Sequence, residues 1–163
     1  MFRIIFNGAP VVEALRATQD RLSDMTPVYQ DIGEYMIEST KGRFRAGVAP
    51  DGSTWAPKRP STIERYRRLG DGNLTKPLLG PSRRLSNEIS MSAERSSVEV
   101  GSNLEYSGVM QEGAVKGQFG ADRHGRPIPW GNIPARVWLG LSDVDERNIV
   151  DIADEHLELI AKG

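Results

Sequence analysis

The sequence predicts an α+β fold, in which helices at both ends flank a short pair of strands and two long loops. Three observations predict this class. Apolar residues recur at helical spacing near both ends of the 163-residue chain. Two short segments between residues 89 and 102 have the two-residue period of strands. Of the 17 glycines and ten prolines, 13 and eight respectively lie between Gly47 and Gly140, which indicates a middle rich in turns. We expect a single domain over residues 1–163.

The composition is that of an ordinary globular protein, and it excludes several kinds of site. Hydrophobic residues make up 38% and charged residues 26% of the chain. The formal net charge of −1 gives no global attraction to nucleic acid or membrane. The absence of cysteine excludes disulfides, thiolate metal sites and cysteine nucleophiles. The N-terminal MFRIIFNGAP is too interrupted for a signal peptide, and no apolar run reaches about 18 residues, so we expect neither a leader nor a membrane span.

The N-terminal quarter predicts a strand and two helices. Residues 2–6 form a β-branched and aromatic run that ends at an Asn-Gly turn. Pro10 then suits the first turn of a helix, because the N–H that it lacks is unpaired there anyway. A second helix is expected to have Thr26 as its N-cap and Pro27 in its first turn, and to end near Gly47. The expected apolar faces are Val11, Leu15, Leu22 and Met25 in the first helix, and Val28, Ile32, Tyr35 and Met36 in the second.

The rest of the chain alternates long loops with short elements. Residues 47–82 and 113–132 are rich in glycine and proline, and loops of such length are usually functional or become ordered by a partner. The expected short elements are a helix at 82–89, antiparallel strands at 89–93 and 96–102, and a brief helix or further strand at 106–111. Ser142-Asp-Val-Asp145 is a capping-box pattern that opens a final helix. Its expected face comprises Ile149, Ile152, Ala153, His156 and Ile160.

Charge is divided unevenly along the chain. Residues 43–84 contain ten Lys/Arg against three Asp/Glu, a net of +7, whereas residues 142–163 contain seven Asp/Glu against two Lys/Arg, a net of −5. Copies with such patches attract one another head to tail, since a heterologous contact joins two different surfaces. Alternatively, the two regions meet within one subunit or are merely solvated. The sequence leaves both interpretations open.

Two motifs of the first loop have competing structural and functional interpretations. Asp51-Gly52 favours a tight turn that Trp55 anchors on the core, in preference to a ligand site. The basic run at 58–68, which includes Tyr66, suits a nucleic-acid backbone and base stacking. A solvated helical face explains the same run, and Glu64 and the slightly negative chain weaken the nucleic-acid interpretation. A nucleic-acid-binding module using 58–68 is therefore the alternative function, and we expect nucleic acid not to be the partner.

No constellation of residues points to catalysis. The two histidines, His124 and His156, have no metal-ligand spacing and no nameable orienting partner. A hydrolase that uses His124 is a third hypothesis, but the sequence suggests no substrate for it. The sequence contains no P-loop, no GxSxG and no GxGxxG. We expect no enzyme activity, no metal and no cofactor.

The segment IPARVWLGLS at 133–142 has two interpretations. Pro134 holds the chain extended. In the alternating pattern that follows, Val137, Leu139 and Leu141 alternate with Arg136 and Trp138. Either Arg136 and Trp138 point outward together as an interface anchor, for which both residue types are favoured, or Trp138 faces the core and the others do not. The spacing leaves both open.

Four segments, in this order along the chain, resemble the phage virion morphogenesis proteins, the tail-completion proteins of Mu-like and related tailed phages. They are PDGSTWAP at 50–57, LLGPSRRLSNEI at 78–89, VEVGSNLEYSGVMQEG at 98–113 and IPARVWLGLS at 133–142. The resemblance runs from about Phe44 to the C-terminus. It departs at Met110, where the family commonly has histidine, and at Arg83-Arg84, where Gly-Arg is common. Motif positions with an implied structural role are Asp51, Gly52, Tyr106, Gly113, Pro134, Leu139 and Gly140.

The resemblance implies a non-enzymatic protein that acts in tail completion or head–tail (neck) joining. It implies an α+β fold with a small antiparallel sheet packed by helices. It also implies a ring-like homo-oligomer that docks on tail-tube or terminator, connector or portal proteins, in the virion or in the host bacterial cytoplasm during assembly, without membrane contact. From the first loop and the 133–142 segment, the residues expected at subunit or partner contacts are Trp55, Arg65, Arg67, Arg68, Arg136 and Trp138.

Overall fold

The computed structural model describes residues 9–162, and the strand expected at residues 2–6 lies outside the described residues. The elements are α1 (Ala9–Ser23), α2 (Thr26–Ala46), α3 (Pro60–Arg68), α4 (Arg84–Asn87), β1 (Ser90–Ala93), β2 (Val98–Gly101), α5 (Ser107–Glu112) and α6 (Asp143–Lys162). β1 and β2 pair antiparallel, from Ser90 opposite Gly101 to Ala93 opposite Val98. Helices with a two-stranded antiparallel sheet confirm the predicted α+β class.

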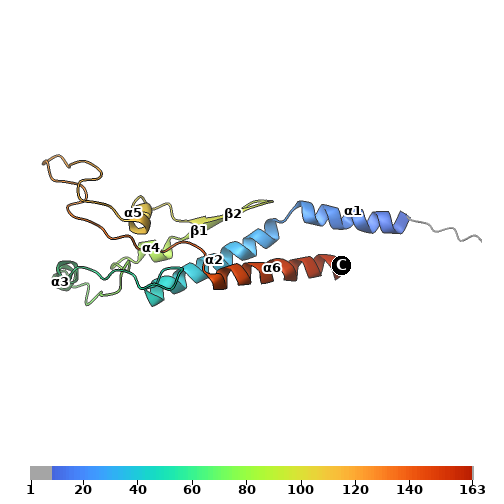
Figure 1. Cartoon of the computed structure of the whole chain (residues 1–163), viewed down its shortest axis with the longest axis horizontal. Helices are drawn as coiled ribbons and strands as arrows, with labels where there is room; N and C mark the ends of the chain where they lie inside the picture. Colours follow the sequence, from blue (N-terminus) through green and yellow to red (C-terminus); the bar gives the residue numbers. More distant parts are fainter. Residues whose placement is uncertain (1–8, 163) are drawn as a thin grey trace, which may run out of the picture.

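The molecule is elongated, and α2 runs along its middle (Figure 1). The sheet and α6 both pack on α2. Val28, Ile32 and Met36 are buried on one face of α2, because residues four apart on a helix lie on the same side. Tyr35 is half-buried beside them, so the predicted apolar stripe is confirmed. Gly33 lets the sheet approach, since a Cβ there would lie 2.1 Å from the Met91 Sδ.

Two details of the first helices differ from expectation. The N-cap of α2 is Met25, not Thr26, and it makes no side-chain cap hydrogen bond. The Thr26 side chain instead faces Asp24, whose Oδ1 accepts the Thr26 N–H at 3.1 Å and its hydroxyl at 2.5 Å. The predicted helix α1 forms, but Leu15 and Leu22 of its expected apolar face are 65% and 43% exposed, and Met25 lies beyond its end, half-buried against the α2 core.

The capping box at the start of α6 is confirmed in both directions. The Asp145 N–H donates to the Ser142 Oγ at 3.2 Å, and the Ser142 N–H donates to the Asp145 Oδ2 at 2.8 Å. The expected face of α6 is half-buried along its length, and Ile149, Ile152 and Ala153 pack on the α2 core. Farther along, the His156 Nε2 lies 2.7 Å from the Asp31 Oδ2 of α2.

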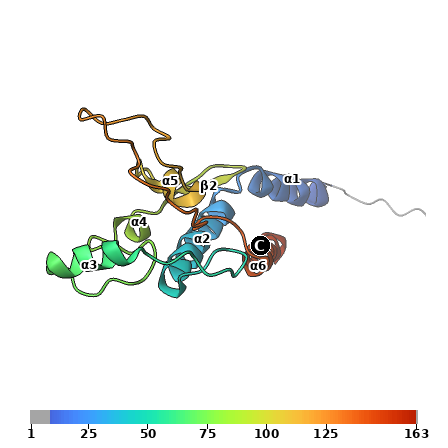
Figure 2. The same cartoon turned by 60° about the vertical axis from the view of Figure 1, so that its left-hand side comes forward.

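The two long loops differ in structure. Residues 47–82 contain α3, a nine-residue helix that begins with Pro60 at its first position, as the helical interpretation of the basic run expected, and none of its residues is buried. Residues 113–132 contain no helix or strand, only isolated bridges such as Ala114 with Ile133. This second loop projects away from the helices in both views (Figures 1 and 2). The segment expected as a helix or strand at 106–111 forms the helix α5, and the short helix expected at 82–89 is α4.

Candidate partner-binding site

The 133–142 segment closes one hydrophobic core. Trp138 is 3% exposed and packs with its ring centroid 5.9 Å from that of Phe44, while Trp55 meets the same phenyl ring at 5.4 Å. The Trp138 Nε1 donates to the Ser107 carbonyl at 3.2 Å, and the Trp55 Nε1 donates to the Val137 carbonyl at 2.8 Å. Both indoles therefore have their polar atom satisfied inside the subunit.

Arg136 lies on the same side of this extended segment as Trp138, and that side faces inward. Its Nε donates to the Ala56 carbonyl at 2.7 Å and its Nη2 to the Pro57 carbonyl at 3.1 Å. With 9% of its surface exposed, Arg136 is a buried cation. The interpretation in which Arg136 and Trp138 point outward is thus wrong, and the apolar side chains left at the surface are Val137 and Leu141. Whether the buried residues also contribute to a contact with a partner stays a prediction.

The other motif positions build the frame of this segment. Gly52 has φ +81 in the turn that Trp55 anchors, and the Asp51 Oδ1 accepts the Ser53 N–H at 2.8 Å. Gly113 has φ +78, and a Cβ there would lie 2.7 Å from the Ala135 nitrogen and the Ile133 oxygen. Glycine is therefore required by both conformation and space at position 113. Pro134 is exposed, Tyr106 is 39% exposed at the start of α5, and Leu139 packs against the core.

Gln111 holds the segment in place and was not singled out by the sequence. Its Oε1 accepts the Trp138 N–H at 2.9 Å and the Leu139 N–H at 3.1 Å, and its Nε2 donates to the Leu139 carbonyl at 2.8 Å. The Arg136 N–H donates to the Met110 carbonyl at 2.9 Å. One amide side chain thus satisfies three backbone groups from α5, and the only sequence signal was its place in the MQEG stretch.

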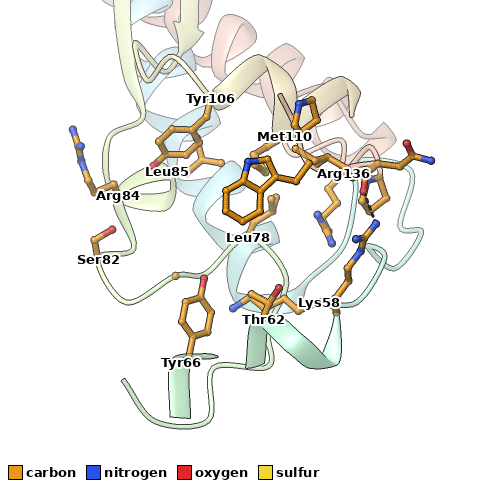
Figure 3. Close-up of a pocket in the computed structure, with 18 residues that line it drawn as sticks. Lys58, Thr62, Tyr66, Leu78, Ser82, Arg84, Leu85, Tyr106, Met110 and Arg136 are labelled. Atoms are coloured by element: carbon orange, nitrogen blue, oxygen red, sulfur yellow. Dashed lines mark hydrogen bonds between the residues drawn. The ribbon is translucent and has the colours of Figure 1, made fainter. Parts of the chain in front are cut away.

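A cleft of about 440 Å³ opens next to this segment. Figure 3 shows Lys58, Thr62 and Tyr66 along one side of it and Leu85, Tyr106 and Met110 along the other. Its remaining walls include the exposed Trp130 and three arginines, Arg59, Arg84 and Arg136. We call this the basic cleft. Apolar walls with a few charged groups are typical of sites that bind a ligand or a peptide.

Two cations of the basic cleft have no anionic partner. The Lys58 Nζ donates to the carbonyls of Leu74 at 2.8 Å and Leu79 at 2.6 Å, and it lies 4.8 Å from the Tyr66 ring centroid. Among residues 9–162, neither Lys58 nor Arg136 forms an ion pair with a carboxylate. Burial, and then the charge of Arg136, lowers the pKa of Lys58, and burial lowers the pKa of Arg136. The charges of Lys58 and Arg136 are therefore uncompensated, whereas Arg84 in the same cleft pairs with Glu88.

The three predicted contact arginines of α3 lie outside this cleft and in solvent. No residue of α3 is buried, and Arg65, Arg67 and Arg68 are all exposed. Arg67 pairs with Glu64 at 3.7 Å and donates to the Asn73 Oδ1 at 3.1 Å. These side chains are available to a partner of opposite charge.

The basic and acidic segments of the sequence meet inside the subunit near the start of α6, and their other parts lie apart. Arg43 and Asp145 form a buried ion pair between α2 and α6. By contrast, α3 lies at one end of the molecule, and the C-terminal end of α6 lies far from it, next to α1 (Figure 1). The interpretation in which the two regions meet within one subunit is therefore confirmed for this pair, and attraction between copies stays a prediction.

Within residues 9–162 there is no group of three His, Cys, Asp or Glu side chains placed to hold a metal ion. His124 is exposed on the second loop, where its ring contacts the Arg123 Nε at 3.1 Å. None of the helices in the described part combines the length and the apolar composition needed to cross a bilayer.

Comparison with protein families gives the class of this chain. Residues 7–158 match the model of the phage virion morphogenesis family, so the chain belongs to that family. No curated protein and no solved structure matches it. The suspected resemblance is therefore confirmed over almost the whole chain. The protein has a role in phage structure and assembly, and its family suggests a structural function associated with the virion and not a catalytic one.

Proposed function

We propose that the protein acts in tail completion or head–tail (neck) joining, by forming a ring of identical subunits that docks on other virion proteins. Membership of the phage virion morphogenesis family supports the assembly role. The observation that carries self-association is the opposite charge of the two ends of the elongated subunit.

The basic end comprises α3 and the basic cleft, and the acidic end comprises the C-terminal half of α6. There Asp151, Asp154 and Glu155 are exposed and form no ion pair with any residue from 9 to 162. A contact between unlike ends is heterologous, and a heterologous contact repeated with a closing rotation generates a ring. Complementary charges steer such an encounter and make it sensitive to salt.

Helix α1 supports contact with another chain. It has 15 residues, its described side chains are exposed, and it touches α6 through the Arg21 Nη1, which donates to the Ile160 carbonyl at 3.3 Å. Isolated helices of about this length are marginal in water. Cover of Leu15 and Leu22 by a neighbouring copy would stabilise the helix.

Docking to other virion proteins, such as tail-tube, terminator, connector or portal proteins, is assigned to the projecting second loop. Phe119 is 52% and Trp130 72% exposed on it, and Ile128 is exposed between them. Large apolar side chains gathered on one projecting segment are typical of protein contacts, and tryptophan is among the residues most enriched there.

Deletion of the gene from a phage or prophage that encodes the chain tests this proposal. We expect heads and unattached tails to accumulate in electron micrographs, and the titre of infectious particles to recover when the wild-type chain is supplied from a plasmid. Complete, infectious particles at undiminished titre in the absence of the protein would contradict the proposal.

One observation favours the alternative, a nucleic-acid-binding module that uses residues 58–68. Arg65, Arg67 and Arg68 are all exposed on α3, as contacts with phosphates require. The aromatic residue of the run is less suited to this role, since Tyr66 is half-buried beneath the Lys58 ammonium group. The alternative is therefore weaker, and a DNA-binding measurement separates the two functions.

A further inference from the structure

We propose that the basic cleft is the receiving half of the contact between subunits, and that it binds the carboxylates in the C-terminal half of α6 of a second copy. This inference rests on the proposed self-association and names the two surfaces that perform it. Nothing in the family match assigns either surface.

Two cations of the basic cleft, Lys58 and Arg136, have no anionic partner among residues 9–162. Lys58 and Arg136 donate to backbone carbonyls, which satisfy their hydrogen bonds but carry no full negative charge. The two cations repel one another, and their pKa values are lowered by burial. Partly buried cations are normally paired with anions. A carboxylate that enters the cleft would therefore be attracted by both cations and would relieve their repulsion.

The walls of the basic cleft combine charged and apolar side chains. Arg59 at the rim is exposed, and its Nη2 holds the Asn132 carbonyl at 2.8 Å. Arg84 on the other side is exposed and pairs with Glu88. Tyr66, Met110 and Trp130 add apolar surface between these charges. A volume of about 440 Å³ admits a few side chains of a docked helix, so the cleft suits a ligand with both carboxylates and apolar groups.

Helix α6 presents both carboxylates and apolar side chains on its exposed surface. Asp154 and Glu155 follow Asp151 by three and four residues, and residues at these spacings are neighbours on a helix. Their like charges destabilise the free helix by a small amount, which a facing cation would offset. One turn later, Leu157 is 43% and Leu159 67% exposed. The acidic cluster and the adjacent leucines thus match the cations and the aromatic walls of the cleft.

The geometry of the subunit selects a second copy as the occupant. The basic cleft lies beside α3, at the end of the molecule that is far from the C-terminus of α6 (Figure 1). The acidic end therefore cannot fold back into the cleft of its own subunit. When one copy presents α6 to the cleft of the next, each subunit keeps one free cleft and one free α6, so the contact repeats.

A mixing experiment with two neutralised variants tests the inference. The cleft variant carries Arg59→Gln and Arg84→Gln, and the acidic-end variant carries Asp151→Asn, Asp154→Asn and Glu155→Gln. All five side chains are exposed, so both variants should fold, which circular dichroism and thermal melting would verify. Sedimentation velocity at about 50 mM salt, where screening is weak, measures association.

We expect each variant alone to self-associate roughly tenfold or more weakly than the wild type, because one lacks two of the four cations of the cleft and the other lacks the three carboxylates of α6. A one-to-one mixture should form heterodimers at wild-type affinity, since each pair retains one intact cleft and one intact α6, and it should stop at dimers. A control variant with Arg65→Gln and Arg68→Gln removes the same charge outside the cleft and should lose roughly threefold or less.

Two results would overturn the inference, and only the second would also contradict self-association. If the wild type self-associates and both variants match it, or if the mixture associates no better than its components, the cleft assignment is wrong while self-association stands. If the wild type is a monomer at every concentration, self-association itself is wrong, and the gene deletion then tests the assembly role separately.

Discussion

The guanidinium of Arg43 in α2 pairs with the carboxylate of Asp145 in the first turn of α6, and both side chains are buried. Asp145 also accepts hydrogen bonds from Tyr35 at 2.9 Å and Ser39 at 2.5 Å, and the Arg43 Nη1 donates to the Gly140 carbonyl at 2.7 Å. One carboxylate thus joins α2, the end of the 133–142 segment and α6. The ion pair and these hydrogen bonds hold α6, and with it the acidic end, in a fixed direction from the core.

Removal of the cation should destabilise the subunit strongly. Arg43→Met leaves the Asp145 carboxylate buried without its charge partner, and we expect a loss of about 3–5 kcal/mol in the free energy of unfolding. Arg67→Met removes an arginine from the exposed pair with Glu64 and should change it by about 1 kcal/mol or less. Urea denaturation measures both, and equal losses would show that the buried pair has no special role.

Stability should fall in acid through Asp145. Burial raises the pKa of this carboxyl, but hydrogen bonds from Ser142, Ser39 and Tyr35 outweigh burial and lower the pKa from 3.8 to about 2. Because the folded pKa lies below the unfolded value, the contribution is complete above pH 3.8 and is lost as the pH falls toward 2. It amounts to about 2 kcal/mol.

The matching variant for this pH dependence is Asp145→Asn, which cannot titrate at this position. It should be less stable at neutral pH, and its stability should fall less steeply between pH 4 and pH 2. The other carboxyls with lowered pKa values, such as those of Asp24 and Asp122, contribute equally to both proteins. Urea titrations of both proteins at several pH values in this range measure the dependence. If the free energy of unfolding fell equally steeply with pH in both, the acid sensitivity would not come from Asp145.

Gly113 and Gly117 form a matched pair for testing the frame of the 133–142 segment. Both have φ +78, but a Cβ at Gly113 would lie 2.7 Å from backbone atoms, whereas the nearest atom at Gly117 is the Pro127 Cβ at 3.6 Å. We expect Gly117→Ala to cost about 1 kcal/mol through conformation alone. Gly113→Ala should cost about 2–4 kcal/mol because overpacking adds to it. Similar melting temperatures for the two variants would argue against the close approach.

Trp138 and Trp130 should differ in their contribution to stability. Trp138 is 3% exposed against Phe44, and Trp138→Ala should cost about 3–5 kcal/mol by leaving a cavity. Trp130 is 72% exposed, and Trp130→Ala should change the free energy of unfolding by about 0.5 kcal/mol or less. Chemical denaturation followed by circular dichroism would contradict the inward orientation of Trp138 if the order of the two losses were reversed.

Binding to DNA should be absent at about 50 mM salt if the basic end serves protein contacts. Fluorescence anisotropy with a labelled duplex measures this directly. Binding that weakens steeply as salt rises would instead support the nucleic-acid alternative, since release of counterions produces that dependence.

Local signals in the sequence predicted much of the fold. The capping box at Ser142, the antiparallel strands near residues 89–102 and the turn at Asp51-Gly52 depend on residues close together in the chain, and all three form as expected. The Thr26 cap failed because Asp24, two residues earlier, binds the threonine hydroxyl. Helix α3 was expected only as one interpretation of the basic run, because glycines and prolines surround it, although Pro60 at its start was a usable signal.

The candidate site was harder to predict because it depends on tertiary contacts. A two-residue period places Arg136 and Trp138 on one side, but it does not state which side meets the core. The carbonyls of Ala56 and Pro57, about 80 residues earlier, decide that Arg136 turns inward. The basic cleft joins residues from four separate parts of the chain, so the sequence showed its positive charge but not its shape.

The mass of the wild-type protein in solution, measured by light scattering over a range of protein and salt concentrations, tests the central claim most directly. The account predicts assemblies larger than one subunit that grow with protein concentration at low salt and shrink as salt screens the two charged ends. A particle that keeps the 18.0 kDa mass of a single chain under every condition would contradict it.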